Sequence, residues 1–180
     1  MSSLAERLIA VHDALDAARL PHAFGGAIAL AYCVDEPRGT RDVDVNVFVG
    51  IERCDEVLDA MPSEVNISTE DRVGAKRDGQ VRVFFEDTPI DIFLDTDEFH
   101  REVASGIKQV PFEGGVIPVI GCSALIVFKV MFNRTRDWGD IESILDAGTA
   151  GPREALSHLR SILGAEDQAV MRLERLAKDR

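Results

Sequence analysis

The sequence contains no long apolar run. Nowhere do its 180 residues offer the roughly 18 uncharged apolar residues in succession that a membrane-spanning helix requires. The N-terminal stretch carries Glu6 and Arg7 where a secretory signal peptide would have its apolar segment. We therefore expect a cytoplasmic protein without a membrane partner.

Cysteine and histidine are scarce and widely spaced. The three cysteines, Cys33, Cys54 and Cys122, are an odd number and form no C-x-x-C pair. This pattern argues against a disulfide framework, and we expect three reduced thiols. None of the four histidines forms an H-x-H or H-x-x-x-H pair, so a zinc site is not expected either.

The sequence also contains few positively charged residues relative to acidic ones. The 20 Lys and Arg residues face 32 Asp and Glu residues, which gives a net charge of -12. Because Lys and Arg contacts to phosphate supply most of the affinity for nucleic acid, this balance excludes a surface that grips RNA along its whole length. An RNA substrate would need a local basic patch, for which the candidates are Arg38, Arg41, Lys76, Arg77, Arg82, Lys129, Arg134 and Arg136.

The length and the pattern along the chain indicate an α+β protein. A chain of 180 residues suffices for one domain, or for a catalytic core with a helical appendage. Strand and helix signals mix as far as about residue 120, and only helical signals follow. We expect a mixed β-sheet core with flanking helices over residues 1–120 and a C-terminal helical region, residues 121–180, that completes the active site.

Local signals predict most of the elements. Ser3 followed by Glu6 is a capping-box pattern for a first helix that ends near Arg19. Strands are predicted at 22–24, 41–49, 81–85, 89–94, 107–112 and 116–119, helices at 27–32, 52–60, 122–132, 138–147, 152–163 and 166–178, and residues 62–80 remain unassigned. Gly148 and Gly164 stand where helix C-caps belong.

Three carboxylates stand out within the predicted strands. Asp42 and Asp44 are two residues apart in an alternating stretch, so both project from one face, about 6 to 7 Å apart. Asp91 interrupts a second alternating stretch, between Ile90 and Ile92. If the two strands are neighbours, Asp91 joins the other two, and such a cluster needs a cation to offset the repulsion.

Hard oxygen ligands of this kind suit Mg²⁺, which completes its coordination shell with water and substrate phosphates. In two-metal phosphoryl chemistry one ion activates the attacking oxygen and the other steadies the leaving pyrophosphate. Gly25 and Gly26, at a predicted strand-to-helix turn, would let backbone N–H groups approach a phosphate.

These motifs resemble a known superfamily. The runs Gly25–Tyr32, Arg38–Asp44 and Ile90–Phe93 are similar to the G-[GS], D-x-D and late third carboxylate of the nucleotidyltransferase superfamily, which has the DNA polymerase β-like fold. The segment Leu125–Ile141, a helix with Lys129 followed by an Arg- and Asp-rich turn, resembles the AbiEii and MenT-type nucleotidyltransferase toxins of toxin–antitoxin systems.

The resemblance implies a role for each matching position. Asp42 and Asp44 would bind Mg²⁺, two ions in the family pattern, with Asp91 as the third acid. The nucleotide-binding residues would be Gly25, Gly26, Thr40, Arg41 and Lys129, and Asp140 would be an additional catalytic acid.

Plainer interpretations exist for several of these residues. Lys129 borders an apolar helix stripe and could be a solvated lysine. Asp140 could be a favourable charge near a helix N-terminus, and Thr40 a loop hydroxyl.

The resemblance also implies an activity. A toxin of this type transfers NMP from an NTP to the 3′ end of tRNA, which blocks translation, and it is paired with a small antitoxin protein. Two alternatives remain open from the sequence: transfer to a protein hydroxyl or to a small molecule such as an aminoglycoside, and a catalytically silent regulatory module.

Overall fold

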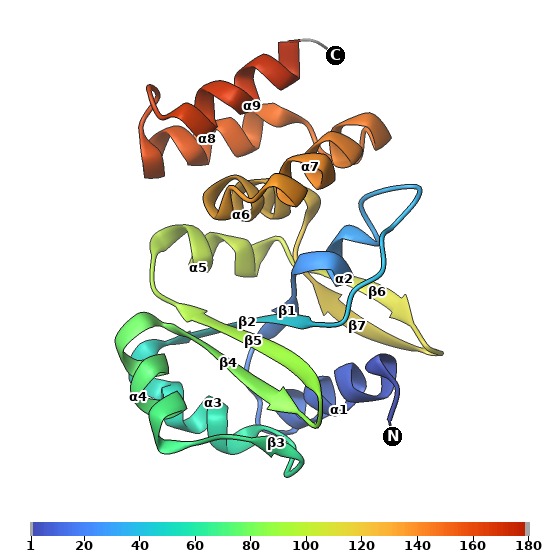
Figure 1. Ribbon diagram of the computed structural model, residues 1–180, viewed down its shortest axis with the longest axis vertical. Helices are drawn as coiled ribbons and strands as arrows, with labels where there is room; N and C mark the ends of the chain where they lie inside the picture. Colours follow the sequence, from blue (N-terminus) through green and yellow to red (C-terminus); the bar gives the residue numbers. More distant parts are fainter. Residues whose placement is uncertain (1, 179–180) are drawn as a thin grey trace. The chain divides into compact units, whose positions relative to one another are not determined.

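The computed structural model describes residues 2–178. They form two compact units (Figure 1). The first contains residues 2–28 and 39–120, and the second contains residues 29–38 and 121–178. The second unit therefore takes one short segment from the N-terminal part of the chain, which the linear division at residue 120 does not include.

The first unit is built on a mixed sheet, which confirms the predicted α+β class. Seven strands pair within the described residues in the order β3-β4-β5-β2-β1-β7-β6. Two neighbouring pairs, β2 with β5 and β1 with β7, are parallel, and the other pairs are antiparallel. The strands are β1 (His22–Phe24), β2 (Val43–Gly50), β3 (Val65–Asn66), β4 (Gln80–Phe85), β5 (Thr88–Asp95), β6 (Lys108–Phe112) and β7 (Gly115–Val119).

Helices flank this sheet on both faces. Figure 1 shows α1, α3 and α4 on one face and α5 on the other. The short helix α2 follows β1 and ends in the segment that belongs to the second unit. The bounds are α1 (Leu4–Ala17), α2 (Gly26–Leu30), the 3-10 turn η1 (Ile51–Arg53), α3 (Cys54–Ala60), α4 (Thr69–Asp78) and α5 (Glu98–Ser105).

Residues of β2 alternate between the buried core and the opposite face of the sheet. Val43, Val45 and Val47 are fully buried, as expected for alternate residues that face packed helices. The residues between them face the other side, where the ring of Phe48 lies 5.3 Å from that of His100 in α5. The apolar face thus holds the strand in place, and the opposite face is left for polar side chains.

Two helices of the first unit, α4 and α5, were not predicted from the sequence. In α4 only Ala75 is buried, so the segment has no apolar stripe to reveal a helix. Its ends do carry signals, because Ser68 and Asp71 form a capping box and Gly79 closes the helix with φ at 68°. The capping box predicted at Ser3 is confirmed, although α1 ends at Ala17 rather than near Arg19.

The second unit is helical, as expected. Its helices are α6 (Cys122–Phe132), α7 (Thr135–Ala147), α8 (Pro152–Leu163) and α9 (Gln168–Lys178). Gly148 and Gly164 are the C-caps of α7 and α8, as predicted. Helix α7 begins three residues earlier than predicted, because Asp137 accepts a hydrogen bond from the backbone N–H of Arg134 and caps the added turn.

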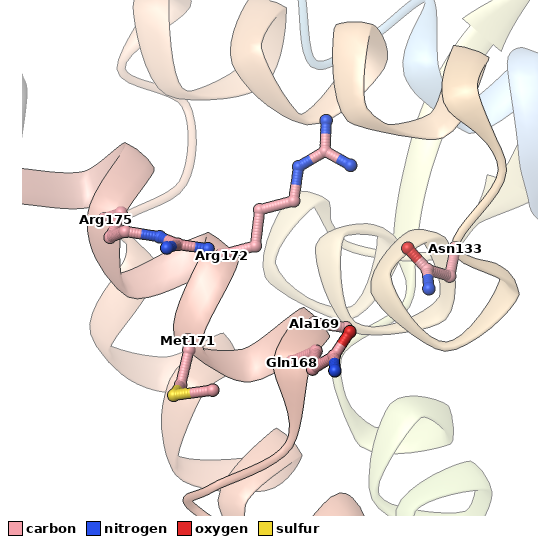
Figure 2. Close-up of a pocket in the computed structure, with 6 residues that line it drawn as sticks. All are labelled: Asn133, Gln168, Ala169, Met171, Arg172 and Arg175. Carbon is pink, nitrogen blue, oxygen red and sulfur yellow. The ribbon is translucent and has the colours of Figure 1, made fainter.

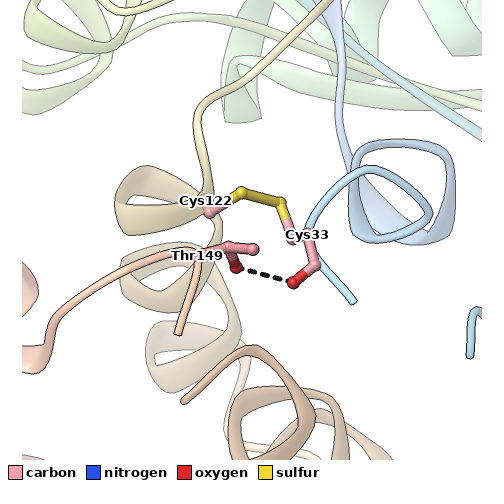
Figure 3. The surroundings of a disulfide bond; sticks show 3 residues. All are labelled: Cys33, Cys122 and Thr149. Carbon is pink, nitrogen blue, oxygen red and sulfur yellow. Dashed lines mark hydrogen bonds between the residues drawn. A yellow bond between two sulfur atoms is a disulfide. The ribbon is translucent and has the colours of Figure 1, made fainter. Parts of the chain in front are cut away.

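A disulfide joins Cys33 to Cys122, so the expectation of three free thiols was wrong for two of them (Figure 3). The Cα atoms are 5.7 Å apart although 89 positions separate the residues in sequence. The hydroxyl of Thr149 donates a 2.6 Å hydrogen bond to the carbonyl of Cys33. Cys54 is free and buried. The pairing depends on the segment 29–38 belonging to the second unit, which the spacing of the cysteines does not reveal.

None of the helices within residues 2–178 combines the length and the apolar character needed to cross a membrane.

The disulfide should stabilise the second unit. Because a cross-link restricts the unfolded chain, reduction is expected to lower the free energy of unfolding by about 2 to 4 kcal/mol. Fluorescence of Trp138, the sole tryptophan, in a guanidinium titration with and without reductant measures this change. A double variant, Cys33→Ser with Cys122→Ser, should match the reduced protein and not respond to reductant. Equal midpoints for oxidised and reduced wild type would contradict the prediction.

Candidate active site

Two of the predicted carboxylates lie side by side. Asp44 on β2 is the direct partner of Asp91 on β5 in the parallel register. Adjacent strands are about 4.8 Å apart, and paired residues project from the same face. Asp42 precedes β2 by one residue and is, like the other two, half-buried. The condition set by the sequence, that the two strands be neighbours, is therefore met.

The Gly25–Gly26 turn packs directly against Asp44. The backbone N–H of Gly25 donates a 2.8 Å hydrogen bond to the carbonyl oxygen of Asp44. Gly26 has φ at 50°, and a Cβ atom placed there would overlap the Asp44 carboxylate. Two independent reasons therefore require glycine at this position: a left-handed backbone and the close approach of a carboxylate.

Thr40 is hydrogen-bonded to Asp42. Its hydroxyl donates a hydrogen bond to the Asp42 carboxylate, and it accepts a 3.4 Å hydrogen bond from the Asp42 backbone N–H. The hydroxyl therefore orients one carboxylate of the group. Arg41, the other residue of this loop predicted to bind nucleotide, is exposed.

The sequence predicts Arg82, on β4, only as a candidate for a basic patch, but the structure places it beside Asp91. Its guanidinium donates two hydrogen bonds to Asp91, of 2.7 Å from Nε and 2.6 Å from Nη2. The pKa of Arg82 is raised, first by this hydrogen bonding and further by the negative charges of Asp91, Asp42 and Asp44. One arginine thus offsets part of the charge of three carboxylates.

The sequence did contain a signal for this contact. Phe85 pairs with Thr88 across the two-residue turn of the β4–β5 hairpin, and the same register pairs Arg82 with Asp91. Residues directly opposite each other in an antiparallel pair share a face. Once the turn is placed at residues 86 and 87, the partner of Asp91 follows by counting.

The donor atoms of this group fit a magnesium ion chemically. Asp42, Asp44 and Asp91 offer carboxylate oxygens, the ligands that Mg²⁺ prefers. Within residues 2–178, however, no three carboxylate, imidazole or thiol groups converge as a ready-made metal site. Both carboxylate oxygens of Asp91 already accept hydrogen bonds from Arg82. For all three carboxylates to hold a cation, Arg82 would have to release Asp91.

Lys129 and Asp140 form a second polar cluster, in the second unit. Lys129 on α6 is only 4% exposed, and its Nζ atom lies 2.5 Å from Asp140 and 3.6 Å from Asp137, both on α7. Arg38 also contacts Asp140, at 3.0 Å. Burial alone would raise the pKa of Asp140, but hydrogen bonds from Arg38 and Lys129 lower it below its usual value.

The second cluster differs from the sequence-based picture in one respect. The sequence allows Lys129 to be a phosphate ligand or a solvated lysine, whereas the structure shows a buried ammonium group between two carboxylates. Asp137, which was not singled out, is 1% exposed. Its position three residues before Asp140 on a helix was the available signal.

The predicted basic patch is largely neutralised. Most of its members pair with acidic side chains: Arg38 and Lys129 with Asp140, Lys76 with Asp55, Arg77 with Asp78, Arg82 with Asp91, and Arg134 with Asp137. Only Arg41 and Arg136 of the eight make no ion pair with another residue in the described range. The members also divide between the two units: Arg41, Lys76, Arg77 and Arg82 belong to the first, and Arg38, Lys129, Arg134 and Arg136 to the second.

No protein-family model matches this sequence, and no curated protein matches it either. Solved structures do match its fold. ANT(2″)-Ia in complex with adenylyl-2″-tobramycin aligns with a TM-score of 0.58 at 16% identity, covering 99% of this chain and 97% of that one. The lincosamide antibiotic adenylyltransferase LnuA aligns with a TM-score of 0.56 at 11% identity, covering 82% of this chain and 99% of that one.

A third match is an antigenic nucleotidyltransferase-like protein from Paracoccidioides brasiliensis, with a TM-score of 0.54 at 17% identity over 95% of this chain and 94% of that one. The chain therefore has a nucleotidyltransferase-like fold. At identities of 11 to 17% the likeness shows the fold alone.

Gly26→Ala should destabilise the first unit. The substitution forces a left-handed backbone on alanine and drives its methyl group into Asp44, at a cost of about 1 to 3 kcal/mol in unfolding free energy. Chemical denaturation followed by circular dichroism measures this cost. Gly74→Ala is the matched control, since Gly74 lies inside α4 with open space around it, and alanine there should be neutral or stabilising. Equal stability of wild type and Gly26→Ala would contradict the assigned contact.

Arg82→Gln should tighten the binding of divalent cations. Removing the positive charge that occupies Asp91 is worth about 1 kcal/mol in a solvent-exposed setting, or about fivefold in affinity. Titration with Mn²⁺ followed by electron paramagnetic resonance measures the affinity directly. Arg77→Gln removes an exposed arginine that pairs with Asp78 and should leave Mn²⁺ affinity unchanged. Unchanged or weaker binding by Arg82→Gln would show that Arg82 does not compete with the cation.

Proposed function

We propose that this protein is a Mg²⁺-dependent nucleotidyltransferase that uses Asp42, Asp44 and Asp91. The observation that carries the proposal is the register of β2 and β5, which sets Asp44 beside Asp91 with Asp42 two residues away. The Gly25–Gly26 turn lies against Asp44. The nucleotidyltransferase-like fold supports it, because the fold and the residues point to the same reaction.

The reaction would join an acceptor hydroxyl oxygen to the α-phosphorus of an NTP and break the bond to pyrophosphate. Bound Mg²⁺ supplies charge stabilisation for the triphosphate and the leaving pyrophosphate. Asp91, once released by Arg82, can accept the proton of the attacking hydroxyl. The backbone of Gly25 and Gly26 carries no side chain that would keep the triphosphate away, and Thr40 keeps Asp42 oriented.

The acceptor that we propose first is the 3′ end of tRNA, with the protein acting in the cytoplasm as the toxin of a toxin–antitoxin pair. The segment Leu125–Ile141 supports this choice through its resemblance to AbiEii and MenT-type toxins. In this proposal Lys129 contacts nucleotide phosphate and Asp140 serves as the additional acid. Lys129 would then have to share its ammonium group between Asp140 and the phosphate.

The second candidate acceptor is a small molecule such as an antibiotic, and the fold comparison favours it. Two of the matched structures are named for this chemistry: one holds adenylyl-2″-tobramycin, and the other is a lincosamide adenylyltransferase with lincomycin bound. Transfer of the same nucleotidyl group to a small hydroxyl compound would need no extended basic surface. This acceptor therefore agrees with the neutralised arginines of the predicted patch.

One labelling experiment tests the reaction and separates the acceptors. The protein is incubated with Mg²⁺ and each α-labelled NTP, together with total tRNA, tobramycin, lincomycin or the lysate proteins. Asp44→Asn should reduce any labelling by about 10² to 10³-fold, because it removes a charge-stabilising group at the reacting phosphate. Asp95→Asn, at the far end of the same sheet face and paired with Arg101, is the matched control.

The outcomes are distinct. Label on tRNA that is lost in Asp44→Asn supports the toxin, and growth arrest on expression of wild type but not Asp44→Asn would accompany it. Label on an antibiotic or a protein supports the other acceptors. If no acceptor is labelled with any NTP although the protein binds NTP, the nucleotidyltransferase proposal fails and a regulatory module remains.

A further inference from the structure

The C-terminal third of the protein carries no net charge, unlike the rest of the chain. Residues 1–120 contain 11 Lys and Arg against 23 Asp and Glu, whereas residues 121–180 contain 9 of each. The entire net charge of -12 therefore lies in the first 120 residues. An anionic ligand meets no general repulsion from the C-terminal helices.

A basic pocket is present in this neutral region (Figure 2). Its volume is about 420 Å³. Gln168, Arg172 and Arg175 follow one another on α9 at i, i+4 and i+7, so they share one helix face. Asn133, at the end of α6, contributes from another helix, as Figure 2 shows. The remaining lining residues are Ala169 and Met171, and no acidic side chain lines the pocket within the described residues.

Contacts with Trp138 hold two of these groups in place. The guanidinium of Arg172 lies over the Trp138 ring, 4.1 Å from its centroid. The indole N–H of Trp138 donates a 2.8 Å hydrogen bond to the amide oxygen of Asn133. Trp138 itself is 1% exposed and therefore a fixed support. With its oxygen engaged, Asn133 has its NH₂ group left to donate.

The pocket consequently presents hydrogen-bond donors of positive or neutral charge. Arg172 and Arg175 form no ion pair with any other residue between 2 and 178, in contrast to most arginines of this protein. Stacking on an aromatic ring leaves the edge of a guanidinium available for hydrogen bonding. Two arginines that lack an acidic partner within the described residues, beside two amides, are a set of donors that matches an anion.

We propose that this pocket binds a phosphate group carried by a larger molecule. A phosphate offers several acceptor oxygens, and arginine binds them through paired, charge-assisted hydrogen bonds. The volume falls in the range of small-molecule sites, which leaves room for the group attached to the phosphate. The inference does not depend on the proposed transferase reaction, because it uses residues of the second unit alone.

Trp138 makes the proposal directly measurable. It is the sole tryptophan and stacks with Arg172, so occupation of the pocket should change its fluorescence. The protein is titrated with inorganic phosphate, pyrophosphate, ATP and a short single-stranded RNA, each against sodium chloride at matched ionic strength. We expect a saturable change with at least one phosphate compound, confirmed by calorimetry.

Substitutions locate the binding. Arg172→Gln and Arg175→Gln should each weaken the affinity by about tenfold, the loss expected for a charge-assisted hydrogen bond. Arg175→Gln leaves the stack on Trp138 intact, so its effect cannot come from a disturbed tryptophan. Arg153→Gln is the matched control, an exposed arginine on α8 that does not line the pocket.

The ligand series identifies the source of the phosphate. Tightest binding of ATP assigns the pocket to a nucleotide, and tightest binding of the oligonucleotide assigns it to an RNA backbone. The proposal is overturned if no phosphate compound binds beyond the sodium chloride control, or if Arg153→Gln weakens binding as much as the pocket variants do. Because Asp44→Asn should leave this binding intact, failure here is distinguishable from failure of the transferase.

Discussion

The parallel pairing of β2 with β5 is the constraint on which the site depends. It sets Asp44 directly beside Asp91, and two carboxylates at neighbouring strand positions repel each other unless a positive charge intervenes. Arg82 on β4 supplies a positive charge that reduces this repulsion, because its guanidinium donates two hydrogen bonds to Asp91. The same register brings Asp44 against the turn after β1, where only a glycine fits.

The register itself is held by the opposite face of the sheet. Val43, Val45 and Val47 on β2 and Ile90 and Ile92 on β5 are almost fully buried. A slip of one residue would turn these side chains to the polar face and bury the carboxylates, so the pairing is strongly specified. Hydrophobic burial on one side thereby positions charged groups on the other, at no cost to the core.

Much of this arrangement could be predicted from the sequence, because it depends on local patterns. Alternation predicted the strands that carry Asp44 and Asp91, and the caps of α1, α7 and α8 were visible in their residue types. Helix α4 was missed because it is polar on nearly all sides, so only its caps identify it. The fold class and the carboxylate group followed from patterns with periods of two and of 3.6 residues.

What could not be predicted depends on long-range contacts. The ion pairs of Lys129 join neighbouring helices, and a periodic pattern does not distinguish a buried lysine with two acidic partners from one at the border of an apolar stripe. The Arg82–Asp91 pair was accessible only through the hairpin register. The disulfide joins residues 89 positions apart and required knowledge that residues 29–38 belong with the C-terminal helices.

That disulfide also changes the covalent topology of the molecule. The bond between Cys33 and Cys122 closes a ring in the chain, and the ring contains six of the seven strands, from β2 through β7. A protease that cuts once anywhere between the two cysteines would open the ring without releasing a fragment. Under oxidising conditions the nicked protein would stay a single covalent species, and it would separate into two pieces only when the sulfur–sulfur bond is reduced.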